Sequence, residues 1–209
     1  MNIISFFQLS AGRWHSCRMT HHLAFKASEM GDSKIVVDYL VADHPAIVEL
    51  CTFHEIAPHL SIGGSRVHWQ GKMQWDREDD DNHEGETIFA IVPDVDTLRR
   101  GRLLRDRGYA EIMPVVGRYE LNDENRLLLT TQYEMMSVTE QIWFDNPNLR
   151  LRTSVVKLYG GFSTAALCTE TRIEGASEPD FQVAGVSELP VTPSQDTLQE
   201  RQSVSVLGW

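Results

Sequence analysis

The run VTEQIWF at residues 138–144 is followed by the turn residues Asn146-Pro147-Asn148 and then by LRLRTSVVKL at residues 149–158. The second run begins with strict alternation of Leu and Arg, the two-residue period of a β-strand with one covered face, and the first run is rich in β-branched and aromatic residues. Asn and Pro between the runs favour a reversal of the chain. This stretch therefore predicts two antiparallel strands joined by a short turn.

The same rhythm repeats along most of the chain. Turn residues such as Gly31-Asp32 and Gly63-Gly64 separate the runs. Eight further runs of strand character lie at residues 13–28, 34–41, 65–76, 86–92, 109–116, 117–122, 126–136 and 163–174. Ten short strands at this spacing predict a mainly all-β fold, an antiparallel sandwich or barrel.

Two helices are predicted beside the strands. The apolar residues between positions 2 and 10 are spaced for one face of a short N-terminal helix that ends before Gly12. A short internal helix follows Asp43, which is a favoured N-cap residue type, and has Pro45 in its first turn. We expect this second helix to pack on the sheet or to close one end of it.

Length and charge exclude several classes of function. The 209 residues, 42% of them apolar, suffice for one domain with a sizeable core. Lys and Arg number 19 against 30 Asp and Glu, for a net charge of −11, which disfavours binding to nucleic acid and to anionic membrane surfaces. We expect a single domain over residues 1–174 and a polar tail over residues 175–209, loosely packed or partly disordered.

Cysteine usage predicts a reducing, cytoplasmic location. Cys17, Cys51 and Cys168 are odd in number and widely spaced, which argues against a disulfide framework or a zinc ribbon. We expect all three to be small packed apolar residues. No apolar stretch approaches the 18 residues of a membrane span.

Gly12-Arg13-Trp14 stands where the first helix passes into the first strand. In lipocalin-type barrels a tryptophan at this place packs under an arginine of a late strand and closes one end of the barrel. Arg150 and Arg152 are the arginines of the matching late strand here. The alternative is an ordinary core tryptophan that follows a glycine.

Strand parity raises a question about the interior. Arg150, Arg152 and Ser154 share one face of their strand, while Leu149 and Leu151 share the other. If arginines lined a barrel together with the tryptophans of the run 65–76, Trp69 and Trp75, the pocket would suit a flat, apolar, anionic ligand. Alternation does not say which face is inside. On the pattern alone, the favoured interpretation is an ordinary amphipathic strand with the leucines in the core and the arginines facing solvent.

Other chemistries find little support. Glu140 is an acid–base candidate on the strand 138–144. The eight histidines show no zinc-ligand spacing, so no metal site is predicted. The acidic run at residues 77–84 lacks the spacing of a calcium loop and is interpreted as a solvated hairpin tip. No nucleophile elbow and no glycine-rich phosphate loop is present in the sequence.

Several stretches, taken together, carry a family resemblance. They are FFQLSAGRW at residues 6–14 with Arg18 and Thr20-His21-His22, Trp69-Gln70-Gly71 with Trp75-Asp76, residues 105–109, WFDNPNLRLRTS at residues 143–154, and Gly160 to Ala165. In this order they resemble the S/U-type phycobiliprotein chromophore lyases of cyanobacteria. The resemblance runs from residue 1 to about residue 174.

The resemblance implies a ten-stranded antiparallel calycin barrel of the lipocalin or fatty-acid-binding type. Such a lyase binds a linear tetrapyrrole, here phycocyanobilin, and attaches it by a thioether to a cysteine of a phycocyanin- or allophycocyanin-type subunit. The expected partners are apo-phycobiliprotein subunits and free bilin, with no permanently bound cofactor, and the exposed apolar residues expected at a barrel rim favour a homodimer. The alternative is a non-catalytic carrier of bilin, haem or fatty acid.

The resemblance also assigns site residues, because the face with the R-x-R-x-S pattern lines the bilin pocket in that family. The implied binding residues are Arg18, Trp69, Trp75, Arg150, Arg152 and Ser154, and the implied catalytic residues are Glu140, Arg150, Arg152 and His21. One conflict follows from geometry. On a regular strand His21 lies on the face opposite to Arg18, so both point inward only if a bulge intervenes.

Overall fold

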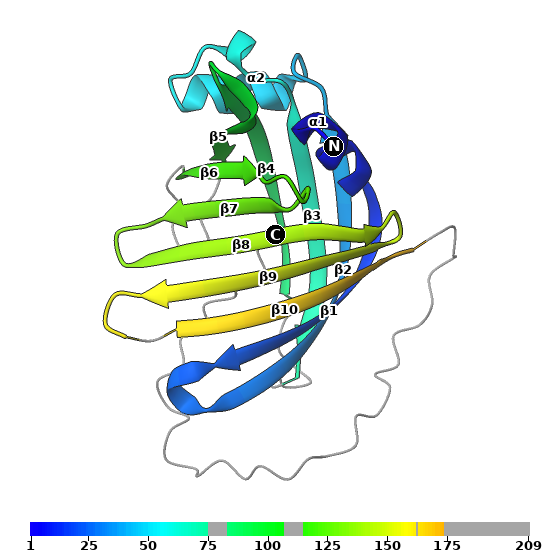
Figure 1. Cartoon of the computed structure of the whole chain (residues 1–209), viewed down its shortest axis with the longest axis vertical. Coiled ribbons are helices and arrows are strands. Elements are labelled where there is room, and N and C mark those ends of the chain that lie inside the picture. Colours follow the sequence, from blue (N-terminus) through cyan, green and yellow to red (C-terminus); the bar gives the residue numbers. More distant parts are fainter. Residues whose placement is uncertain (75–82, 107–114, 162, 174–209) are drawn as a thin grey trace.

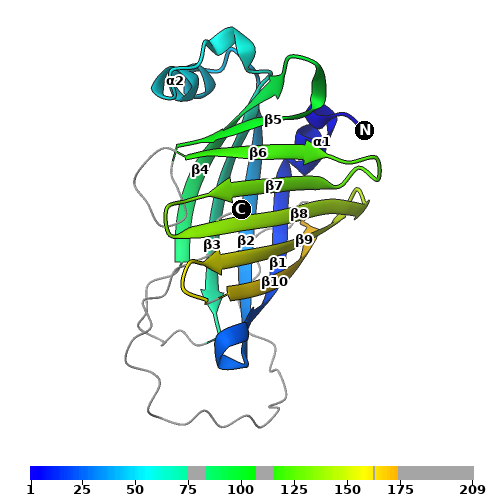
Figure 2. The same ribbon diagram turned by 60° about the vertical axis from the view of Figure 1, so that its left-hand side comes forward.

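A computed structural model describes residues 1–74, 83–106, 115–161 and 163–173. Ten antiparallel strands close into one barrel (Figures 1 and 2), in the order β1-β10-β9-β8-β7-β6-β5-β4-β3-β2. The strands are β1 Gly12–His22, β2 Ala27–Leu40, β3 Gly64–Met73, β4 His83–Asp94, β5 Thr97–Arg105, β6 Val115–Leu121, β7 Leu127–Gln132, β8 Met136–Asn146, β9 Leu149–Leu158 and β10 Ser163–Arg172. The predicted ten-stranded calycin-like barrel is confirmed.

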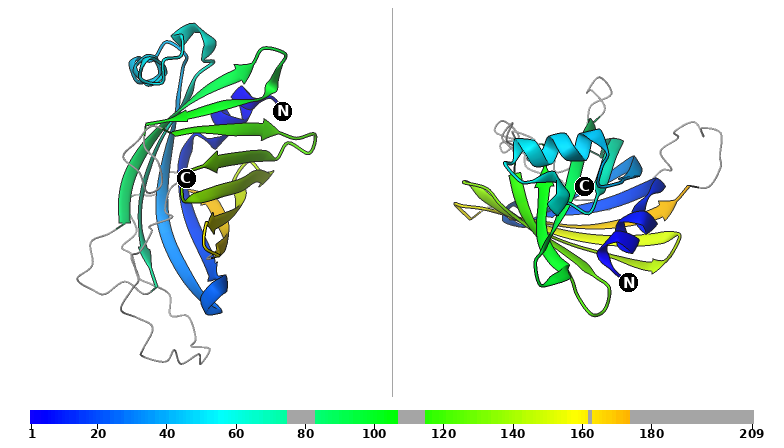
Figure 3. Two further views of the ribbon diagram at one scale, coloured as in Figure 1. Left: turned by 90° about the vertical axis from the view of Figure 1, so that its left-hand side faces the viewer. Right: turned by 90° about the horizontal axis from the view of Figure 1, so that it is seen from above.

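The two predicted helices are present, α1 at Ile3–Ser10 and α2 at Pro45–Phe53. Both lie toward the same end of the barrel (Figure 1), and Figure 3 shows that end from above. The side chain of Asn2 caps α1 by accepting a hydrogen bond from the Ser5 amide at 2.8 Å. The N-cap of α2 is His44 rather than Asp43, because the His44 ring accepts from the Ala46 amide at 3.2 Å.

Two apolar clusters explain where the helices sit. The larger cluster fills one end of the barrel interior, where α1 contributes Ile3, Phe6 and Phe7. The second lies on the outer face, where α2 covers β4 and β5. Alternate residues of β4 therefore serve different cores, since Phe89 and Ile91 belong to the first and Ala90 and Val92 to the second.

Three sequence predictions differ from the structure. Gly31-Asp32 is not a turn between two strands but lies inside β2. The turn between β1 and β2 is instead a short 3₁₀ helix at Leu23–Phe25. Strand β5, in which arginines stand at four of nine positions, was not predicted. Cys17 is exposed rather than packed, whereas Cys51 and Cys168 are buried as expected.

Some predictions fall on residues whose structure is not described. These are the tip of the acidic run 77–84, most of the predicted strand 109–116, and the tail 175–209. The division at residue 174 therefore stays a prediction. Within the described ranges, no helix is both long enough and apolar enough to cross a membrane.

Candidate functional site

Charged side chains lie inside the barrel on β1, β8, β9 and β10. Arg18, Glu140, Arg150, Arg152 and Glu170 are all buried, each with a relative exposure of 6% or less. Along β9 the burial alternates, with Arg150, Arg152 and Ser154 buried and Leu149, Leu151 and Thr153 only partly covered. The arginine face is therefore the inner face, which corrects the interpretation that alternation alone favoured.

Strand register brings these residues together. Arg152 pairs with Cys168 on β10, and Cys168 pairs in turn with Arg18 on β1. Two positions further along β10, Glu170 pairs with Arg150. On the other side of β9, Ser154 pairs with Glu140 of β8. Residues far apart in sequence thus form one polar cluster because their strands are neighbours.

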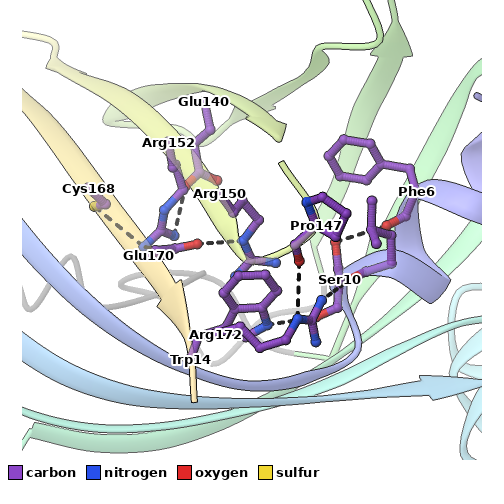
Figure 4. A network of polar contacts seen from close by, with 11 residues as sticks. Phe6, Ser10, Trp14, Glu140, Pro147, Arg150, Arg152, Cys168, Glu170 and Arg172 are labelled. Carbon is purple, nitrogen blue, oxygen red and sulfur yellow. Dashed lines mark hydrogen bonds and ion pairs between the residues drawn. The ribbon is translucent and has the colours of Figure 1, made fainter. Parts of the chain in front are cut away.

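Glu170 is the anion at the centre of this cluster (Figure 4). It accepts a hydrogen bond from Arg150 Nε at 2.5 Å and pairs with Arg152 Nη2 at 3.3 Å. Burial raises the pKa of the Glu170 carboxyl, but the charges of Arg150 and Arg152 outweigh this, so its pKa lies below the ordinary value. Glu170 is therefore a carboxylate although it is fully buried.

Arg150 belongs to the closed end of the barrel. Its guanidinium carbon lies 4.8 Å from the centre of the Trp14 ring, and Arg172 lies over the same ring at 4.2 Å. Trp14 Nε1 donates to the Ser10 carbonyl at 2.9 Å. This is the predicted closure by stacking and cation–π contact, with Arg150 and Arg172 as the two cations.

Arg172 also ties three segments together at that end (Figure 4). It donates to the carbonyls of Leu9 and Ala11, both at 2.7 Å, and to the carbonyl of Pro147 at 3.1 Å. The carbonyls at the end of α1 have no partner within the helix, so a guanidinium is a favourable neighbour there. Arg172 thus fixes α1 and the β8–β9 turn against β10.

A small pocket opens next to this polar cluster. Its wall combines two cations, three apolar side chains and two hydroxyls, and is formed by Ser16, Arg18, Ser33, Ile35, Val67, Trp69 and Arg152. Arg18 Nη2 donates to Ser154 Oγ at 3.5 Å, and Arg152 Nη1 lies 3.5 Å from Glu140 Oε1. The pocket can therefore offer positive charge and an aromatic surface to one ligand.

Gly85 makes room for the indole of this pocket. Trp69 pairs with Gly85 of β4, and a Cβ at Gly85 would lie 2.3 Å from Trp69 Cζ2. Any larger residue at position 85 would push the indole away from the β4 wall. The orientation of Trp69 thus depends on the absence of a side chain across the strand pair.

The structure brings together some of the predicted site residues and not others. Arg18, Trp69 and Arg152 line the pocket, and Glu140 and Ser154 contact its two arginines. Arg150 is not part of the pocket wall. His21 is exposed on the outer face, hydrogen-bonded to Ser28 Oγ at 2.8 Å, because no bulge interrupts β1.

Trp75 lies outside the described residues. Sequence reasoning missed Glu170 and Arg172, and it missed the serines Ser16 and Ser33. Parity contained a signal for Glu170, since it shares a face of β10 with the buried Ala166 and Cys168.

Comparison with known proteins identifies the family to which the chain belongs. Residues 2–173 match the family described as CpeS-like protein. The chain is 56% identical over 169 residues to a phycocyanobilin lyase subunit CpcS of Picosynechococcus, covering 81% of this chain and 85% of that protein. It is 57% identical to a chromophore lyase CpcS/CpeS 2 of Trichodesmium erythraeum, covering 83% and 88%.

A solved structure of a similar protein has the same fold. The S-type phycobiliprotein lyase CPES from Guillardia theta superposes with a TM-score of 0.74 at 30% identity, over 84% of this chain and 95% of that one. The relatives are named as lyases, which leaves the carrier alternative without support. The chain belongs to the CpeS-like family of chromophore lyases.

Proposed function

We propose that this lyase binds phycocyanobilin in the barrel pocket and attaches it to a cysteine of a phycocyanin- or allophycocyanin-type subunit. The observation that carries the proposal is the meeting of Arg18, Arg152 and Trp69 in one pocket. A linear tetrapyrrole is flat and apolar and carries two propionates, so it matches two cations beside an indole. The names of the relatives support the same ligand and acceptor class.

Arg18 and Arg152 bind the propionates in this proposal, and Trp69 packs against a pyrrole ring. Arginine suits the task because its planar fork grips a carboxylate through two hydrogen bonds. Both guanidinium groups are buried, where a charge-assisted hydrogen bond is stronger than in water. Ser154 orients Arg18 by accepting its hydrogen bond.

Glu140 and Glu170 act as positioning residues for Arg152. They lie 3.5 Å and 3.3 Å from its two terminal nitrogens, on opposite neighbouring strands. Glu140 was predicted as an acid–base residue, but in this arrangement it acts on the bilin through Arg152. Arg150 supports the cluster from behind through Glu170 and does not contact the bilin.

The attachment step is an addition in which no group leaves. The sulfur of the acceptor cysteine forms a bond to the exocyclic CH carbon of the ethylidene double bond of the bilin. The electron pair of that double bond shifts into the ring, and the ring carbon takes up one proton, so the elements of S–H are added across the double bond. The protein contributes by holding the bilin in one orientation.

The nucleophile belongs to the acceptor in this proposal. Burial and the neighbouring Asp32 raise the pKa of the Cys17 thiol, and burial raises the pKa of Cys51. Cys168 is buried and accepts a hydrogen bond from Arg152 Nη2 at 3.6 Å. Thiols that are protonated or enclosed are poor nucleophiles. Bilin is then a transferred substrate rather than a resident cofactor.

A transfer assay tests the proposal. The protein is mixed with phycocyanobilin and apo-phycocyanin β subunit, and covalent, acid-stable absorbance is followed in time. Arg152→Ala, Arg18→Ala and Trp69→Ala are expected to slow transfer, whereas Arg118→Ala, an exposed arginine of the barrel, leaves the rate unchanged. Wild-type transfer by all three pocket variants would remove the pocket from the mechanism.

A second arm tests the acceptor thiol as the nucleophile. The triple variant Cys17→Ala, Cys51→Ala, Cys168→Ala is expected to transfer bilin at the wild-type rate. Loss of transfer in a triple variant that still folds and binds bilin would contradict the proposal. The predicted homodimer, the cytoplasmic location and the roles of His21 and Trp75 stay predictions.

A further inference from the structure

Three ligand-type side chains meet on the outer face of β1 and β2. His15 Nε2 lies 2.6 Å from Asp32 Oδ1, and Cys17 Sγ lies 3.6 Å from Asp32 Oδ2 and 4.0 Å from His15 Nδ1. Taking one donor atom from each residue, all three atoms lie within 4.8 Å of one another. Nothing in the proposed lyase chemistry uses this cluster.

Backbone register holds the three residues together. Cys17 stands directly opposite Asp32 in the β1–β2 ladder, and His15 precedes Cys17 by two positions on the same face. A motif search within one strand does not find the cluster, because the third residue comes from the neighbouring strand. The sequence therefore predicted no metal site although the residue types were present.

We propose that His15, Cys17 and Asp32 form a binding site for Zn²⁺ or a similar borderline-soft divalent ion. Thiolate, imidazole and carboxylate are the three donor types that zinc accepts, and tetrahedral zinc holds its donor atoms about 3.5 Å apart. The His15–Asp32 hydrogen bond at 2.6 Å must open for an ion to enter, and His15 then offers one of its two ring nitrogens. Binding displaces the thiol proton of Cys17 to solvent, and one thiolate and one carboxylate then balance the charge of the ion.

Solvent access completes the coordination. The side chains of His15 and Asp32 are 41% and 38% exposed, and Cys17 is exposed, so a water molecule can occupy the fourth position. Lys34 and Lys72 stand opposite His15 and Asp32 in the ladders. Their long stems allow the ammonium groups to turn toward solvent.

The site lies behind the wall of the pocket. Ser16 and Arg18 alternate with the ligands along β1, and Ser33 follows Asp32 on β2, and all three line the pocket. A metal ion across the outer face would tie together the two strands that carry this wall. Metal binding can thus stiffen the wall without entering the pocket.

Cobalt(II) is the probe for the site, because it occupies zinc sites and a bound thiolate gives it an intense near-ultraviolet charge-transfer band. Metal-free protein is titrated with Co²⁺, and the expected result is this band saturating at one ion per chain. All three cysteines lie in the described part of the chain, and Cys17 alone is exposed. Cys17→Ser should abolish the band, and Cys51→Ser should retain it.

Absence of the band in the wild-type protein would overturn the proposal. Retention of the band in Cys17→Ser would do the same, since another cysteine would then be the ligand. Weak binding to other histidines does not interfere, because imidazole alone does not give the thiolate band.

Zinc affinity tests the other two ligands by competition with a chromogenic chelator. His15→Gln and Asp32→Asn should each weaken Zn²⁺ binding by about tenfold or more, since even the loss of an outer-shell partner costs this much. His68→Gln is the matched control, because His68 pairs with Glu84 on the barrel surface at 3.4 Å without a cysteine nearby. Equal Zn²⁺ affinity in the wild type and in both ligand variants would contradict the site.

Discussion

Arg150 and Arg152 stand two positions apart on β9 and point into the same barrel, but their surroundings differ. Arg150 is enclosed between Trp14 and Glu170 at the closed end. Arg152 touches Glu140 and Glu170 and still presents part of its side chain to the pocket. One R-x-R pattern thus supplies a structural cation and a ligand-binding cation.

The difference between the two arginines arises across the sheet rather than along the strand. Arg150 pairs with Glu170 on β10, two positions from the Trp14–Arg172 pair, whereas Arg152 pairs with Cys168, whose small side chain leaves space. Burial lowers the pKa of Arg150, and the charge of Glu170 offsets part of this. Neighbours on other strands therefore decide which arginine is available to a ligand.

The largest effect is expected when the shared anion is removed. Glu170→Ala leaves Arg150 as a buried, uncompensated charge and should lower the free energy of unfolding by about 3–5 kcal/mol. Urea unfolding measures this change. Glu86→Ala is the control, because Glu86 pairs with Arg66 at the exposed outer surface at 3.7 Å. Similar losses in both variants would show that the closed end does not depend on Glu170.

Acid should weaken the closed end for the same reason. The pKa of Glu170 is lower in the folded state than in the unfolded state, so its stabilising contribution is present above the unfolded pKa. That contribution is lost as the pH falls through the folded pKa. The unfolding free energy of the wild type should therefore fall with decreasing pH more steeply below about pH 4.5 than that of Glu170→Gln. Parallel pH profiles would contradict the assignment of a carboxylate.

Arg152 should differ from Arg150 in its effect on bilin transfer by the folded protein. Arg152→Ala removes a charge-assisted hydrogen bond to a propionate, a contribution of about 1.5–3 kcal/mol, so bilin transfer should slow about tenfold to a hundredfold. Arg150→Met keeps apolar contact with Trp14 and should lower the free energy of unfolding. The folded fraction of this variant should transfer bilin at a rate closer to the wild type than Arg152→Ala does. Transfer rates and unfolding curves of both variants separate the two roles. Equal transfer losses would place both arginines in the pocket.

The contrast between Arg150 and Arg152 shows which features of the fold and the site could be predicted from the sequence. Alternation and turn residues predicted ten strands and two helices, and the R-x-R-x-S face was found as a candidate site. Alternation alone favoured the wrong face of this strand, because Leu149 and Leu151 are ordinary core residues and the period does not say which face is inside. The family resemblance supplied the orientation that the pattern lacked.

The features that the sequence did not predict depend on contacts between segments that are distant in sequence. Glu170 and Arg172 act through partners on β9 and α1, and the His15–Cys17–Asp32 cluster joins two strands. No spacing within one segment records such pairs, since register is set by the closure of the whole barrel. His21 shows the converse, because simple alternation along β1 correctly placed it opposite to Arg18.

A moderate effect is expected from Arg172, which joins α1, the β8–β9 turn and Trp14. Arg172→Ala removes a cation–π contact, two partly buried hydrogen bonds to carbonyls and a third, exposed one, so stability should fall by about 1–3 kcal/mol. Arg172→Lys keeps the charge but not the fork and should recover only part of the loss. Thermal or urea unfolding measures both variants, and full recovery by lysine would mean that charge alone matters.

The smallest effect is expected from an arginine with good geometry on the outside of the barrel. Arg118 donates two hydrogen bonds to Asp94, at 3.1 and 2.7 Å, and the pair lowers the pKa of the Asp94 carboxyl. Water and salt screen this pair, and holding two long side chains together costs conformational entropy. Arg118→Ala should therefore leave the urea midpoint nearly unchanged, although its hydrogen bonds to a carboxylate outnumber those of Arg150. A loss comparable to that of Glu170→Ala would mean that hydrogen-bond geometry, rather than burial, determines what an arginine contributes to this barrel.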